Sequence, residues 1–163
     1  MDLERYTNNA KETMVEAMEI ARALDHQAIT TSHVMKAILS NNKKRFRKLI
    51  ELAGGDYFLV LQEAEKLLIS LPRVEGHKNL FVDIKLSEAI KDSEIFADKL
   101  GDKFIGLEAI FLGIALGTGE FAKKLVSKIK NLNRLEEIVL ADRKGNKIET
   151  QAHQEGENIL NDY

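Results

Sequence analysis

Two acidic residues, Asp102 and Glu108, stand close enough in the sequence to raise the question of acid–base chemistry. A carboxylate pair can act as general acid and general base, but catalysis also needs a nucleophile or a shaped polar pocket beside it. The surrounding sequence supplies neither. Glu108 falls near the second position of an expected helix, where a carboxylate meets free backbone N–H groups and the positive end of the helix dipole. We therefore expect helix capping there rather than catalysis.

Other motifs that carry chemistry are missing from the sequence. No glycine precedes a Lys-Ser or Lys-Thr pair, so there is no phosphate-binding loop, and the glycines at 113, 117 and 119 follow no predicted strand. The four histidines lack the spacing of metal ligands, and there is no cysteine to act as a nucleophile or thiolate ligand. The sequence therefore predicts no enzyme activity, no metal site and no cofactor within this chain.

One basic cluster, residues 43–48, reads Lys-Lys-Arg-Phe-Arg-Lys. It could contact phosphates or an acidic partner, so a nucleic-acid-binding protein is one rival interpretation. However, 24 Lys and Arg against 26 Asp and Glu give a net charge of −2, whereas dedicated nucleic-acid binders usually carry a basic excess. We favour a solvated helix face with Phe46, Leu49 and Ile50 turned inward, and we expect no nucleic-acid partner.

The length and composition of the chain are typical of a soluble protein of one domain. A chain of 163 residues can bury roughly 70% of its unfolded surface without disulfide staples. The lack of cysteine fits a reducing compartment, and residues 1–5 lack the features of a signal peptide. The longest apolar run, residues 109–117, is about half the ~20 residues that a membrane-spanning helix needs. We expect a cytoplasmic protein with no membrane partner.

Apolar residues recur at three- and four-residue steps along most of the chain, which is typical of amphipathic helices. Thr30 is expected to cap one helix, the pair Gly54-Gly55 to end another in a left-handed turn, and Pro72 to stop a third. The spacing predicts an all-α fold with helices over residues 6–24, 32–40, 44–53, 57–71, 87–100, 107–116, 120–130 and 132–140.

The two halves of the chain repeat one another. The apolar pattern of residues 20–29 returns 76 positions later, in residues 96–105. Two copies of one multi-helix unit are too few for an open solenoid, so we expect them to pack together. We predict repeat one over residues 1–72 and repeat two over residues 83–140, forming one domain over 1–140. Residues 141–163 are polar, contain glycine and read as a linker followed by the start of a helix.

Several stretches together resemble the N-terminal (Clp repeat) domain of the Clp chaperones of the AAA+ class, of the ClpB type. The most specific is Leu71-Pro72-Arg73-Val74-Glu75-Gly76 between the repeats, and the others are residues 1–8, 29–35 and 100–108. The resemblance covers residues 1 to about 140. It continues into residues 144–163, which look like the linker and first helix before a missing ATPase module. It implies two pseudo-symmetric four-helix repeats, a double Clp N motif, packed into one domain.

The resemblance also implies a function and a site. In that family the domain rides on a flexible linker above a hexameric ATPase ring and engages unfolded or aggregated polypeptide, while ATP and Mg²⁺ bind to the ATPase modules. Asp92 and Ala109 stand where relatives place larger apolar residues of a groove on the fifth and sixth helices. The positions that match residues expected to bind substrate are Thr7, Ile90, Asp102 and Glu108.

We therefore expect the substrate-engaging domain of a disaggregase, with unfolded or aggregated protein as its partner. The full-length parent is expected to be a homohexamer that cooperates with an Hsp-type co-chaperone. The same residues fit a second interpretation, the adaptor-docking domain of a protease-linked Clp unfoldase or a free-standing Clp-repeat adaptor. That alternative predicts saturable binding to a folded partner rather than to unfolded chains.

Overall fold

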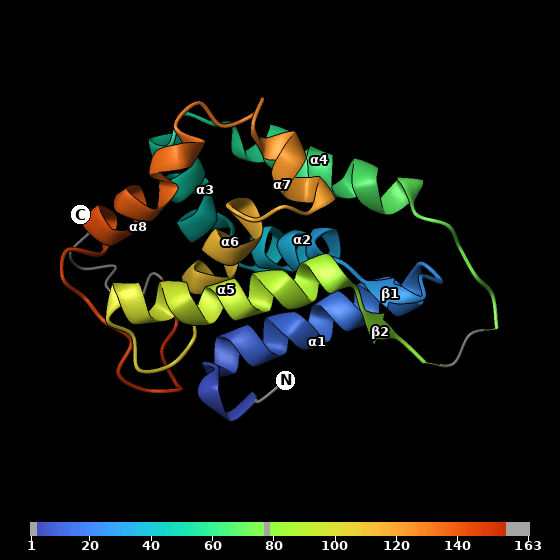
Figure 1. The fold of residues 1–163 in the computed structure, drawn as a ribbon, viewed down its shortest axis with the longest axis horizontal. Helices are drawn as coiled ribbons and strands as arrows, with labels where there is room; N and C mark the ends of the chain where they lie inside the picture. Colours follow the sequence, from blue (N-terminus) through green and yellow to red (C-terminus); the bar gives the residue numbers. More distant parts are fainter. Residues whose placement is uncertain (1–2, 77–78, 156–163) are drawn as a thin grey trace.

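The computed structural model describes residues 3–76 and 79–155, and helices dominate them (Figure 1). Two 3₁₀ helices, Leu3–Arg5 and Leu132–Arg134, accompany eight α-helices in these ranges. The α-helices are α1 (Asn8–Ala23), α2 (Thr31–Asn41), α3 (Lys43–Leu52), α4 (Tyr57–Ser70), α5 (Ile84–Leu100), α6 (Leu107–Ala115), α7 (Glu120–Leu125) and α8 (Leu135–Arg143). The predicted all-α fold is confirmed. Within the same ranges, no helix is both long and apolar enough to cross a membrane.

Local sequence signals decide where several helices begin and end. The Thr30 side chain accepts a hydrogen bond from the first turn of α2, and His33 reaches back to the Thr30 N–H, which makes a capping box. After α3, Gly54 adopts the left-handed conformation with φ of 84°. α4 ends at Ser70, shortly before Pro72, which cannot continue a helix. The predicted signals at these three places are confirmed.

The last two helices differ from those predicted over residues 120–130 and 132–140. α7 already ends at Leu125, where the chain enters a turn in which the N–H groups of Lys128 and Ile129 both donate to the Leu125 carbonyl, and it then bonds to the first repeat. The backbone N–H of Asn131 donates to the carbonyl of Ala53 at 2.8 Å, in the loop after α3. α8 begins and ends three residues later than predicted, after a turn of 3₁₀ helix.

Two short parallel pairings join the repeats, a feature that helical periodicity does not predict. β1 (Ala28–Ile29) pairs with β2 (Phe81–Val82), and Tyr6 forms an isolated parallel bridge with Ile105. The two pairings are equivalent under the 76-residue repeat. The segment before α1 pairs with the segment before α6, and the segment before α5 pairs with the segment before α2. Each repeat thus supplies the strand that the other repeat pairs with, as pseudo-symmetry requires.

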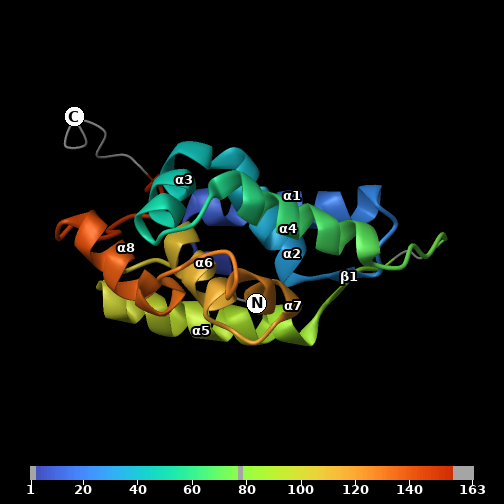
Figure 2. The ribbon, with the colours of Figure 1, turned by 90° about the horizontal axis from the view of Figure 1, so that it is seen from above.

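α2 and α6 form the centre of the fold. In Figure 1 they lie between α1 and α5 on one side and the remaining helices on the other. Figure 2 shows the first repeat, blue to green, lying beside the second, yellow to red. Every residue of α6 is buried, and the rings of Phe46 in α3 and Phe111 in α6 are 5.0 Å apart between centroids. The two repeats therefore share one hydrophobic core.

α5 and α6 approach each other most closely at Gly113. A Cβ on this residue would overlap the carbonyl oxygen of Ala89 and lie 3.1 Å from the backbone nitrogen of Ser93, both in α5. Backbone atoms within a helix cannot move aside for a new methyl group as the end of a flexible side chain can. Glycine at this position therefore lets the two helices pack.

We predict that Gly113→Ala lowers the free energy of unfolding by about 1–3 kcal/mol, because the added methyl group forces α5 and α6 apart. Urea denaturation followed by circular dichroism measures the loss. Gly119→Ala is the matched control, since a Cβ there comes no closer than 3.3 Å to its surroundings. Equal stability of the two variants would show that the contact at Gly113 is not tight.

Candidate functional site

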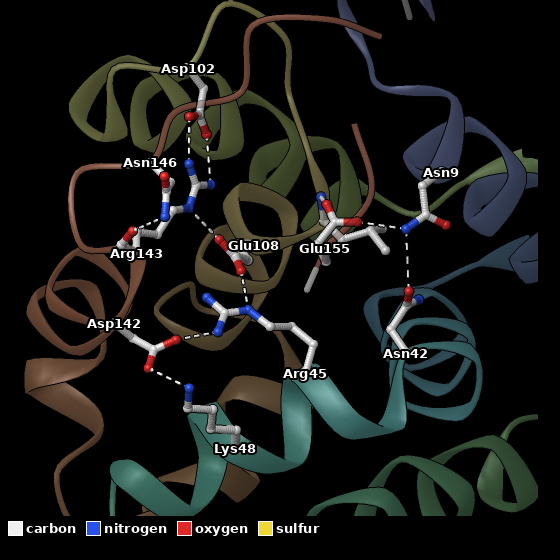
Figure 3. Close-up of polar contacts among 11 residues, drawn as sticks. Asn9, Asn42, Arg45, Lys48, Asp102, Glu108, Asp142, Arg143, Asn146 and Glu155 are labelled. Atoms are coloured by element: carbon white, nitrogen blue, oxygen red, sulfur yellow. Dashed lines mark hydrogen bonds and ion pairs between the residues drawn. The ribbon is translucent and has the colours of Figure 1, made fainter. Parts of the chain in front are cut away.

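Charged side chains form a buried network where the two repeats meet (Figure 3). At its centre the guanidinium of Arg143 donates to both oxygens of Asp102, at 2.5 and 2.8 Å, and its Nε donates to Glu108. The side chains of Arg143 and Asp102 are only 7% and 0% exposed. Two parallel N–H···O bonds from one guanidinium give a strong and geometrically specific ion pair. The two acidic residues singled out by the sequence thus bind one arginine.

Arg45 of α3 extends these contacts into the first repeat. Its guanidinium binds the other oxygen of Glu108 and one oxygen of Asp142, whose second oxygen lies 3.1 Å from Nζ of Lys48. Two cations of the first repeat, Arg45 and Lys48, therefore face carboxylates of the second half, and Arg143 on that side is the third cation. We call the six residues the ion network: Arg45, Lys48, Asp102, Glu108, Asp142 and Arg143.

The basic cluster of residues 43–48 is thus only partly the solvated face that the sequence suggested. Phe46, Leu49 and Ile50 are fully buried, so their predicted inward orientation is confirmed. Arg45 is instead inside the ion network, because buried carboxylates of the second repeat compensate its charge.

The ion network keeps Arg143 and Asp142 charged. Burial alone would lower the pKa of Arg143, but its hydrogen bonds to Asp102 and the nearby charge of Glu108 raise the pKa far above the ordinary value. Burial likewise acts to raise the pKa of Asp142, yet Arg45 and Lys48 hold it below its usual value. General acid–base catalysis requires a group whose pKa lies near the working pH. Arg143 and Asp142 are therefore suited to forming stable ion pairs rather than to moving protons.

Residues 144–155, expected to belong to a linker, lie against the domain. Ile148 is fully buried, and its N–H donates to the ion network at 3.0 Å. Further along, the side-chain amide of Gln151 donates to the carbonyl of Glu4 at 2.7 Å. This segment therefore connects the second repeat with the beginning of the chain. Residues 156–163, where the start of a further helix is expected, lie outside the described residues.

Glu155 caps α6. Gly106 at the N-cap has no side chain to accept a bond from the first turn, and the carboxylate of Glu155 accepts from the Leu107 N–H at 2.8 Å and from Asn9 Nδ2 at 2.6 Å. A Cβ on Gly106 would lie 3.0 Å from this carboxylate, so glycine leaves room for it. Glu108 does lie in the first turn of α6, as expected, but its two oxygens bind arginines rather than the backbone N–H groups.

The structure buries all four residues that the resemblance assigned to substrate binding. Thr7 caps α1 by accepting a bond from the N–H of Ala10 at 3.1 Å, and Ile90 in α5 is 9% exposed. Asp102 and Glu108 meet at the ion network, whereas Thr7 and Ile90 belong to separate helices. For the four of them, contact with substrate stays a prediction.

A polar hollow of about 290 Å³ lies over α5 and α6, where the resemblance placed a groove. Its walls include the charged side chains of Lys85, Glu88 and Asp92. Ala109 does not line it and is fully buried. An apolar side chain would displace water from charged groups there without replacing their hydrogen bonds, which is costly. This polar hollow is a poor place to bind an apolar segment.

An apolar hollow of about 400 Å³ opens beside the polar one, between the end of α6 and α7. Leu116 and Gly117 line both, so the two hollows adjoin. Val126, directly after α7, is 71% exposed, so its aliphatic side chain is open to solvent at this hollow. We define the apolar hollow by its lining residues: Ala115, Leu116, Gly117, Ala122, Val126, Ile129, Lys130, Leu132 and Asn133.

Sequence reasoning missed the apolar hollow, because the predicted helix over residues 120–130 would have given Val126 and Ile129 ordinary places in an amphipathic helix. The structure shows Ile129 buried and Val126 exposed, after a helix that has already ended. No Gly, Asn or Pro directly follows Leu125 to mark the end of the helix, so the sequence contains no local signal for the site.

Two histidines that are seven positions apart in the sequence meet in the core. Nδ1 of His26 lies 2.8 Å from Nε2 of His33, and Nδ1 of His33 accepts from the Thr30 N–H at 2.9 Å. That bond assigns the His33 proton to Nε2, which donates to His26. Burial lowers the pKa of His33 to about 4, and the neighbouring His26 adds to the shift. The described residues contain no group of three or more potential metal ligands.

Comparison with known proteins gives this arrangement a context. A family model described as "Clp repeat (R) N-terminal domain" matches residues 5–128. The chaperone protein ClpB of Rickettsia felis is 26% identical over 165 residues, and that of Rhizobium meliloti is 27% identical. Both alignments cover the whole of this chain and 19% of the relative. The chain thus spans about a fifth of the length of the curated relatives it matches.

Solved structures share the fold at low sequence identity. The Hsp104 N-terminal domain from Candida albicans superposes with a TM-score of 0.78 at 12% identity, covering 90% of this chain and 96% of that one. The N-domain of ClpV from Vibrio cholerae has a TM-score of 0.68 at 18% identity and covers 86% and 87%. A ClpV N-domain has also been solved in complex with a VipB peptide, with a TM-score of 0.65 at 18% identity, covering 86% and 89%.

The histidine pair predicts a loss of stability in acid. In the unfolded chain His33 takes up a proton near its ordinary pKa of 6.5, whereas in the folded chain it stays neutral until about pH 4. The unfolded state therefore binds more protons between these values, and the free energy of unfolding falls by up to roughly 3 kcal/mol as the pH is lowered through this window. NMR titration of the His33 ring checks the cause, and a ring that titrates near pH 6.5 in the folded protein would contradict it.

The ion network predicts a large cost for losing Arg143. Arg143→Ala leaves Asp102 and Glu108 buried beside fewer positive charges, and we expect a loss of about 3–5 kcal/mol in the free energy of unfolding. Arg134→Ala, which removes an exposed pair with Glu137, is the control and should cost less than about 1 kcal/mol. Urea denaturation of both variants measures the difference. Similar small losses would show that the network adds little stability.

Proposed function

We propose that this chain, which belongs to the Clp repeat N-terminal domain family, is the client-engaging domain of a ClpB-type chaperone. In this proposal it binds apolar segments of unfolded or aggregated polypeptide and passes them to an ATP-dependent ring of AAA+ modules. The observation that carries the proposal is the apolar hollow beside Leu116 and Val126. Unfolded chains differ from folded ones in exposing apolar side chains, and this hollow can remove such side chains from water.

The expected affinity is low. Burying one aliphatic side chain gains roughly 1.5–3 kcal/mol, and part of this gain is offset because a flexible segment must be ordered on binding. Binding would therefore tolerate many sequences and release them readily. In the proposed parent, six domains on one ring would raise the effective concentration of sites around a client. Weak capture by each domain is then sufficient for the assembly.

The residues that the resemblance named have an indirect part in this proposal. Asp102 and Glu108 hold α8 through Arg143, and the turn that leads into α8 supplies Leu132 and Asn133 to the wall of the apolar hollow. Thr7 and Ile90 help to position α1 and α5. We propose that these four residues shape the surface to which clients bind.

The wider properties of the parent follow the same proposal. We propose a homohexamer in the cytoplasm that binds ATP and Mg²⁺ in modules beyond this domain and cooperates with an Hsp-type co-chaperone.

In a second proposal the same apolar hollow binds a dedicated partner protein instead of unfolded clients. The VipB peptide bound to a ClpV N-domain supports a domain that recognises one particular segment of a dedicated protein. Under this alternative the chain docks an adaptor for a protease-linked unfoldase. Saturable binding to one folded partner, without binding to unfolded chains, would favour it.

The apolar hollow predicts where clients bind. Titration of the ¹⁵N-labelled chain with a reduced, carboxymethylated unfolded protein should shift amide signals around Leu116 and Val126, with a dissociation constant between about 10 µM and 1 mM. Val126→Glu should weaken binding about tenfold or more, because a carboxylate would enter the apolar hollow.

Ile69→Glu is the matched control, since Ile69 is an aliphatic residue on α4 that is 84% exposed and does not line the hollow. It should bind clients as the unchanged protein does. The proposal fails if no signal shifts at millimolar client, or if both substitutions weaken binding equally.

A further inference from the structure

The apolar hollow lies in the most basic short segment of the second repeat. Between residues 120 and 133 the sequence has four lysines and one carboxylate, Glu120, although the chain as a whole has a net charge of −2. Two of the lysines lie in α7 and two between α7 and the second 3₁₀ helix: Lys123, Lys124, Lys128 and Lys130. A client that binds the hollow must therefore come close to a concentration of positive charge.

Part of this charge is not engaged by carboxylates of the domain. Lys130 lines the hollow, and in the described ranges neither it nor Lys124 has an ion-pair partner. Lys128 lies 3.7 Å from Glu63. Lys123 lies 3.5 Å from Glu120, but both side chains of that pair are mostly exposed, so water and salt screen the interaction.

The opposite end of the surface has a different charge. The adjoining polar hollow is lined by Glu88 and Asp92, and its single cation, Lys85, lies 3.3 Å from Glu88. Across Leu116, which both hollows share, the surface therefore changes from positive beside α7 to negative beside α5. A bound segment would meet this gradient along its length.

We propose that this surface selects extended segments in which an apolar residue has aspartate or glutamate on the side that lies along α7. The inference rests on the proposed function and names its preferred clients. The apolar side chain enters the hollow between Leu116 and Val126, and the acidic residues lie beside Lys130 and the other lysines of α7. Segments with basic flanks are disfavoured there, because like charges repel in the same geometry.

Three peptides of equal length test the inference. They share one apolar core and carry flanks of glutamate, glutamine or lysine, and fluorescence anisotropy measures their affinity for the full chain at 25 and 300 mM NaCl. At low salt we expect the glutamate peptide to bind about 3–10 times more tightly than the glutamine peptide, and the lysine peptide to bind most weakly. At high salt the three affinities should converge, since added ions screen exposed charges.

Lys130→Glu should abolish or reverse the preference while the glutamine peptide still binds. Lys11→Glu is the control, because α1 lies on the other side of the fold from α7 (Figure 1), and it should leave the preference unchanged. Equal binding of the three peptides, unaffected by Lys130→Glu, would overturn the acidic preference and leave the proposed function standing. Failure of all three peptides to bind would overturn both.

Discussion

The fold depends on compensating buried charge between its two halves. Taking a guanidinium and a carboxylate out of water is expensive, and the expense is offset only when each charged group finds a close partner of opposite sign. In the ion network three cations meet three carboxylates, and Arg45 and Lys48 come from the first repeat while the carboxylates come from the second. The charges can therefore be satisfied in one arrangement of the repeats. That arrangement also places the 3₁₀ turn before α8, which forms part of the wall of the apolar hollow.

Much of the fold could be predicted from the sequence, because local interactions decide it. Apolar spacing identified eight helices, and Thr30, Gly54 and Pro72 marked boundaries through capping, a left-handed turn and a missing N–H. The end of α7 could not be predicted, because no local residue marks it and the chain beyond the turn bonds to the first repeat, as the Asn131 N–H does to the Ala53 carbonyl. The two short parallel pairings between the repeats could not be predicted for the same reason.

The site was less predictable than the fold. Nothing in residues 43–48 distinguishes Arg45 from its solvated neighbours, since its partner Glu108 lies 63 positions away. Conversely, Val126 fits an amphipathic pattern and becomes a surface feature only because its helix ends early. The proposed client-binding surface thus arises from a departure from helical regularity, whereas the acidic residues that were visible in the sequence, Asp102 and Glu108, form ion pairs within the domain.

The reciprocal pairing of Tyr6 with Ile105 and of β2 with β1 has a further meaning. In an isologous interface, as in a twofold-symmetric dimer, both subunits use the same two patches: patch A of each subunit contacts patch B of the other. The domain has the architecture of such a dimer whose two subunits have been fused into one polypeptide. The connection between α4 and β2 then acts as a tether. Because of this tether, the two repeats associate within one molecule rather than between two. Each repeat therefore meets the other at an effective concentration that does not fall when the protein is diluted.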